Sequence, residues 1–150
     1  MKLKIDTETL IKEFFEDTVL LGIVAPVKDY ILSWQLNQMM GFDFRVNHEI
    51  EIQLTKKGKP VSLERQYYFP IYEYKVPSSV LKHFLYNNEY DGEFLLPEFK
   101  HLDFLWLVKY EPISDQEKEN LIQSIRSLPS VQLVTEMTNE KIRNKQNLIF

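Results

Sequence analysis

The chain has 150 residues, a length that fits one domain able to bury a core of its own. Its 18 basic and 22 acidic residues give a formal net charge of −4, which excludes a general attraction to nucleic acid or anionic membranes. The chain has no cysteine, and this excludes disulfides, thiolate metal sites and thiol nucleophiles.

The N-terminal segment is charged, and two apolar stretches follow it. Its charges come too early for the apolar core of a signal peptide, and no apolar run approaches the ~20 residues needed to span a bilayer. We therefore expect a single cytoplasmic domain, residues 1–150. Apolar residues at helical spacing predict a short N-terminal helix: Leu10, Ile11, Phe14 and Phe15. Residues 18–24 then predict a buried strand, in which Gly22 marks a close approach or a bulge.

The segment from Lys28 to Met40 predicts a helix that ends at Gly41. Its apolar side chains fall on two strips. One strip consists of Val27, Tyr30, Ile31 and Trp34, and the other of Leu32, Leu36, Met39 and Met40. A helix of this kind is covered on two faces, by the sheet and by either another element or a second subunit. The sequence therefore predicts a homodimer or a protein partner through this helix.

A polar line of Asp29, Ser33 and Asn37 separates the two strips on one side. The spacing of four residues places the three side chains on one face of the helix. They are candidates for a ligand-binding stripe. The alternative is a solvated ridge or a set of hydrogen bonds to a neighbouring loop. We favour the alternative because buried polar groups often serve structure alone.

The middle of the chain predicts an antiparallel meander of three strands, residues 46–54, 61–74 and 80–86. A basic turn, Lys56 to Pro60, separates the first two, and Pro70 interrupts or borders the second. Strict alternation places five side chains of the first strand on one face: Val46, His48, Ile50, Ile52 and Leu54.

The second strand of the meander is rich in aromatic residues. Four tyrosines beside Arg65 and Lys75 are candidates to stack a small ligand or single-stranded RNA: Tyr67, Tyr68, Tyr72 and Tyr74. Aromatic residues are also common in strands because they pack well across a pleated sheet. We favour packing and expect no nucleic-acid partner.

Residues 104–108 form the most apolar run of the chain and predict a central strand buried on both faces. Pro97 predicts a short helical turn before it. Glu98, His101 and Asp103 are residue types that transfer protons in catalysis. Their spacing does not place them on a common face. We therefore favour a structural role, in which the two carboxylates accept hydrogen bonds from backbone amides.

The last third of the chain predicts a helix between two strands. Ser114 and Glu117 have the spacing of a capping box, Pro129 ends the helix, and residues 131–137 predict a strand. With residues 104–108 they make a βαβ unit with parallel strands, and residues 18–54 make a first such unit. We expect an α+β fold: a two-layer sandwich whose ferredoxin-like core of two βαβ-type units carries an inserted antiparallel meander. The apolar C-terminal end, residues 148–150, should be held in place, either packed into its own domain or added to a sheet edge of a partner chain.

The segment from Leu96 to Phe104 resembles the signature of the IPExxxVDY family of uncharacterised bacterial proteins. Pro97, Glu98 and Asp103 match the motif, whereas Leu96, Leu102 and Phe104 replace its isoleucine, valine and tyrosine. The resemblance extends to residues 21–23, to positions within 29–37 and to residues 147–150. Because Phe104 lacks a hydroxyl, no role of that tyrosine hydroxyl carries over. The family has no assigned activity, so the resemblance implies none here.

Motifs for cofactors and catalysis are absent from the sequence. All four glycines are isolated, so no phosphate-binding loop exists, and His48, His83 and His101 are scattered without metal-ligand spacing. We expect no metal and no cofactor. We favour a non-catalytic interaction or assembly protein. The alternatives are a binder of small ligands or single-stranded RNA, and an enzyme that uses Glu98, His101 and Asp103.

Overall fold

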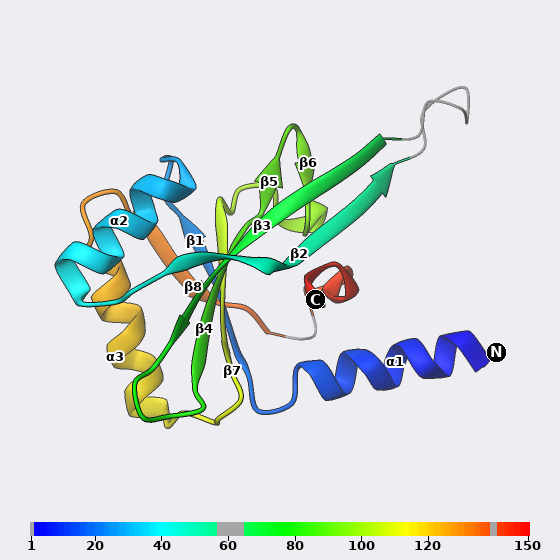
Figure 1. The fold of residues 1–150 in the computed structure, drawn as a ribbon, viewed down its shortest axis with the longest axis horizontal. Coiled ribbons are helices and arrows are strands. Elements are labelled where there is room, and N and C mark those ends of the chain that lie inside the picture. The colour runs from blue at the N-terminus through cyan, green and yellow to red at the C-terminus, as the bar shows by residue number, and fades with distance from the viewer. Residues whose placement is uncertain (1, 57–64, 139–140) are drawn as a thin grey trace.

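The computed structural model describes residues 2–56, 65–138 and 141–150, and it has a mixed α+β fold (Figure 1). Six strands form one sheet in the order β2-β3-β4-β7-β1-β8. These strands are β1 (Val19–Val24), β2 (Arg45–Lys56), β3 (Arg65–Lys75), β4 (Lys82–Asn87), β7 (Phe104–Lys109) and β8 (Leu133–Glu136). The helices are α1 (Lys2–Phe14), α2 (Asp29–Met40) and α3 (Asp115–Arg126). None of these helices is long and apolar enough to cross a membrane.

The order of the strands confirms the predicted fold class. Every neighbouring pair in the sheet is antiparallel, so β1 runs parallel to β2, and β7 runs parallel to β8. In each βαβ unit, however, other strands lie between the two parallel ones. Without the inserted β3 and β4 the order is β8-β1-β7-β2, which is the βαββαβ arrangement of a ferredoxin-like core.

Strand β7 is the central strand, as its apolar sequence predicts, and all six of its residues are buried. Phe104, Trp106 and Val108 point to the face that α2 and α3 cover, whereas Leu105 and Leu107 point to the opposite face. On β1, Gly22 confirms the expected close approach. A Cβ atom at this position would lie 2.5 Å from Leu102 Cδ1.

The second face of the sheet is covered by short segments rather than by a layer of helices. They are the turn η2 (Pro97–Phe99), the C-terminal end of α1 and the turn η4 (Lys145–Leu148). Lys109 anchors α1, because its Nζ donates a hydrogen bond to the Phe14 carbonyl and lies 4.1 Å from the centre of the Phe14 ring. The rest of α1 points away from the sheet (Figure 1).

The C-terminal end is packed inside its own domain, one of the two predicted arrangements. Leu148 is fully buried, and its carbonyl accepts a hydrogen bond of 2.9 Å from the Tyr86 hydroxyl. The Phe150 ring lies 4.8 Å from the Phe84 ring and 5.2 Å from the Phe14 ring, measured between centroids. These contacts complete a second hydrophobic core, which lies on the face of the sheet opposite α2 and α3.

Strand β2 departs from the predicted alternation. Val46 pairs with Tyr72 and Glu51 pairs with Pro70, so a bulge lies between them. Val46 consequently packs on the helix-covered face, whereas Ile50, Ile52 and Leu54 pack on the other. His48 is exposed. The prediction of one common face is wrong at Val46 and His48, because four residues of β2 oppose a single residue of β3. The expected turn at 57–60 and the strand residues 61–64 lie outside the described residues.

Candidate functional site

A cleft of about 560 Å³ lies where the sheet meets the N-terminal end of α2. Its walls come from the start of α2, the end of β4, the small hairpin of β5 (Glu89–Tyr90) and β6 (Glu93–Phe94), and the start of β7. The lining residues are Val27, Lys28, Asp29, Asn87, Glu89, Tyr90, Asp91, Asp103 and Phe104. Four carboxylates and one amine make the cleft acidic.

The carboxylate of Asp29 ties α2 to the sheet. It accepts hydrogen bonds from the Tyr30 amide at 2.8 Å and from Asn87 Nδ2 at 3.0 Å. The Tyr72 hydroxyl also bonds to Asp29, and burial, with the Asp29 charge, raises the pKa of Tyr72 well above its usual value. Tyr72 therefore stays a neutral donor to this carboxylate. The Asp29 oxygens are already occupied by protein partners.

Two further carboxylates of the cleft accept hydrogen bonds from the backbone. Asp103 Oδ2 accepts from the Ala25 amide at 2.8 Å, and Glu89 Oε1 accepts from the Gly92 amide at 2.7 Å. The Asp103 bond is of the kind expected from the sequence, a backbone amide donating to the carboxylate, and it joins the start of β7 to the loop after β1. The lining contains no histidine, serine or threonine, so no serine or threonine hydroxyl lies beside an imidazole base in this cleft.

Glu98, His101 and Asp103 each lie in a different environment. Glu98 accepts hydrogen bonds from the Arg143 amide at 2.6 Å, the Asn144 amide at 2.9 Å and Asn144 Nδ2 at 2.8 Å. Burial raises the pKa of Glu98, but these hydrogen bonds outweigh it and hold the pKa below its ordinary value. His101 is exposed, and only Asp103 lines the cleft. Glu98 therefore holds the C-terminal segment in place. The sequence of the turn around Glu98 gives no sign of this role.

Asn88 organises the segment between β4 and β7, although no motif in the sequence marks it for this role. It is fully buried. Its Nδ2 donates to the carbonyls of Phe99 and Leu102, both at 2.9 Å, and its Oδ1 accepts from the Leu96 amide at 2.9 Å. One side chain thus satisfies three backbone groups of the segment that carries the family-like motif. An asparagine next to a turn residue is the only signal in the sequence, and it is a weak one.

The polar line of α2 faces the protein rather than solvent. Asn37 exchanges two hydrogen bonds with the backbone of Phe44, at 2.8 and 3.1 Å, and so fixes the loop after α2. Ser33 is buried, and its Oγ has no hydrogen-bond partner among the described residues. Asn37 is therefore bonded to a neighbouring loop, as the favoured interpretation predicts, and of the three residues only Asp29 reaches the cleft.

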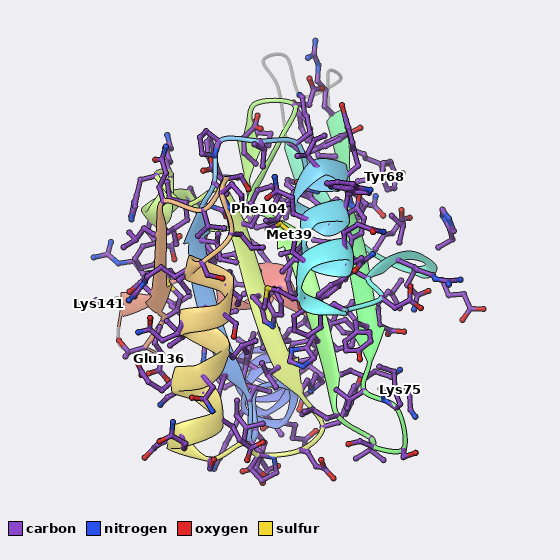
Figure 2. The ribbon with its side chains drawn as sticks, turned by 90° about the vertical axis from the view of Figure 1, so that its left-hand side faces the viewer. Met39, Tyr68, Lys75, Phe104, Glu136 and Lys141 are labelled. Atoms are coloured by element: carbon purple, nitrogen blue, oxygen red, sulfur yellow. The ribbon has the colours of Figure 1, made fainter. Side chains whose placement is uncertain are left out.

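The aromatic strand packs mainly into the two cores. Tyr72 is buried, and Tyr74 lies between the rings of Phe42 and His83, with centroids at 5.2 and 6.0 Å. Tyr67 is half-buried against the second core. Tyr68, another residue of the aromatic strand, is exposed on β3 (Figure 2). Tyr72 and Tyr74 therefore pack against other side chains of the domain.

The outer face of α2 is the most unusual surface of the described chain. Tyr30, Ile31, Trp34 and Met39 expose 62, 38, 61 and 59% of their surface, and among the residues whose burial the structure describes, no other helix or strand exposes more than one large apolar side chain. Leu32 and Leu36 are fully buried against the sheet. The two predicted strips thus exist, but Met39 belongs to the exposed one and Val27 packs against the core. Helix α2 lies in front of the sheet in Figure 2.

No group of three or more potential metal ligands converges among the residues that the structure describes. No protein-family model matches the chain, and no relative is found among curated proteins. The resemblance to the IPExxxVDY family therefore stays a prediction.

Proposed function

We propose that the protein is a non-catalytic interaction or assembly protein that binds a protein partner through the outer face of α2. The observation that carries this proposal is the exposure of Tyr30, Ile31, Trp34 and Met39 on one helix. Exposed clusters of large apolar side chains mark interaction surfaces, and aromatic residues and methionine are enriched in interfaces. The partner is a second copy of the chain or another protein.

The hydrogen bonds of the cleft carboxylates and the absence of cysteine are compatible with this proposal. Three carboxylates of the cleft accept hydrogen bonds from the protein itself, which supports a structural role over proton transfer. We place the protein in the cytoplasm as part of the proposal, because a chain without cysteine is compatible with a reducing compartment.

Photo-crosslinking in the cells that make the protein tests this function. Benzoylphenylalanine replaces Gln38, an exposed and uncharged residue of α2. The matched control carries the same probe at Gln123, an exposed residue of α3. We expect a covalent protein adduct from position 38 and none from position 123. Equal labelling from both positions, or none from position 38, would contradict the proposal.

A further inference from the structure

Five residues of α2 are exposed, and none of them is charged: Tyr30, Ile31, Trp34, Gln38 and Met39. At about 100° per residue, Ile31 and Gln38 lie near the middle of this face, Trp34 lies between them and Tyr30, and Tyr30 and Met39 lie at its two edges. The only charged residue of α2 is Asp29, which bonds to Asn87 of the same chain. An identical face can therefore approach without repulsion between like charges.

We propose that the partner of this face is a second copy of the chain, bound antiparallel about a two-fold axis near Trp34. This inference rests on the proposed function and names its partner. A two-fold contact pairs each residue with its counterpart in reverse order. With the axis between positions 34 and 35, Ile31 faces Gln38 of the second copy, and the two Trp34 rings meet near the axis.

The reversed order also suits the cation at the start of the helix. Lys28, exposed just before α2, reaches the C-terminal end of the second α2, where the helix dipole favours a cation. A parallel arrangement would instead place Lys28 against Lys28.

The size of the face predicts a weak dimer. A whole aromatic side chain buries about 150–250 Å², so the four apolar side chains, partly exposed as they are, offer roughly 400 Å² per copy. A standard interface buries about 800 Å² per partner, and interfaces well below that size are weak or transient. We therefore expect a dimer that dissociates in the micromolar range.

Disulfide trapping tests the arrangement directly, because the natural chain has no cysteine. Ile31→Cys and Gln38→Cys are made as two separate proteins. Antiparallel helices packed about 8–10 Å apart bring position 31 of one copy next to position 38 of the other, whereas two copies of position 31 lie about 10 Å apart along the axis. We expect linked dimers when the two proteins are mixed and few from either alone. Linkage of Ile31→Cys to itself, or no linkage in the mixture, would overturn the arrangement.

Sedimentation of the unmodified protein and of Trp34→Glu completes the test. The substitution should weaken the dimer at least roughly tenfold, as the loss of a central aromatic anchor does, while circular dichroism shows an intact fold. Leu10→Glu, an exposed apolar residue on α1, is the matched control and should leave the dimer unchanged. A monomer at all concentrations, with an adduct from position 38 to a different protein, would refute the second copy but keep the proposed function. A monomer without any adduct would refute both.

Discussion

At the scale of single residues, the polar side chain that matters most to the fold is Asn88. It lies where β4 ends and satisfies backbone groups on both sides of η2, at Leu96, Phe99 and Leu102. Its own backbone pairs with Asp103 at 3.0 Å and with Leu95 at 2.8 Å. No apolar side chain of similar volume can replace these bonds, because the backbone groups would remain buried without partners.

The first prediction follows from this arrangement. Asn88→Ala should lower the free energy of unfolding by about 3 kcal/mol, since three buried backbone groups lose a partner at about 1 kcal/mol or more each. Asn88→Asp should cost a similar amount, because it keeps the acceptor for Leu96 but loses both donors. Asn120→Ala, at an exposed position of α3, is the control and should stay within about 0.5 kcal/mol. Chemical denaturation measures all three, and an Asn88→Ala variant as stable as the control would disprove this role.

At the scale of elements, the sequence predicted the features that depend on interactions between residues close together in the chain. The capping box of Ser114 and Glu117 forms as expected, with the Glu117 amide donating to Ser114 Oγ at 3.1 Å. Gly41 ends α2 with a φ of 72°, a conformation that glycine adopts without strain. The burial of β7 also followed from its own composition. In each case the deciding interactions lie within a few residues or depend only on hydrophobicity.

The features that escaped prediction depend on contacts between distant segments. The bulge of β2 depends on its register with β3, which alternation within β2 cannot reveal. The partners of Glu98 lie 45 and 46 positions further along the chain. In the candidate site, the residue types Asp29 and Asp103 were recognised, but the cleft they share with the β5–β6 hairpin was not. Sequence spacing indicates which residues share a face and gives no account of which faces meet.

The second prediction concerns the C-terminal segment as an element. Glu98→Ala removes the three acceptor contacts that hold residues 143 and 144, and should cost about 2 kcal/mol, within the range for hydrogen bonds to a charged group. The amides of Arg143 and Asn144 should then exchange with deuterium much faster, whereas the amides of β7 should exchange as before, because only the segment is released. Glu98→Gln keeps an acceptor and should show a smaller change. An equal increase in the rate of amide exchange along the whole chain would contradict this prediction, because Glu98 would then hold more than the C-terminal segment.

At the scale of the whole molecule, one buried base links the stability of the domain to pH. His83 lies on β4 inside the aromatic core, and its Nδ1 accepts a hydrogen bond of 2.9 Å from Trp106 Nε1. Burial lowers the pKa of His83 from 6.5 to about 4. Protonation would place a charge among the rings of Phe42, Tyr74 and Trp106 and would remove the acceptor for the Trp106 N–H.

The direction of this pH dependence follows from the number of protons that His83 binds in the folded and unfolded states. Between pH 6.5 and about 4 the unfolded chain binds the proton at His83 and the folded domain does not, so stability falls as the pH falls through this window. At about 1.4 kcal/mol per pH unit, the loss reaches roughly 3 kcal/mol at the lower end. Glu98 acts in a different range. Its pKa is lowered in the folded state, so its contribution is lost only as the pH falls below its ordinary value of 4.5.

The third prediction is that His83→Gln flattens this pH dependence. Glutamine offers an acceptor to Trp106 Nε1 and does not titrate, so the variant should lose little stability between pH 6.5 and pH 5, where the natural protein loses about 2 kcal/mol. Urea denaturation at half-unit pH intervals measures the slope for both proteins. The slope is informative even if the variant is less stable at pH 7, because a packing defect shifts the whole curve without tilting it. His101→Gln, at an exposed histidine, serves as the control and should keep the slope of the natural protein. Parallel curves for the natural protein and His83→Gln would show that another group links the fold to pH.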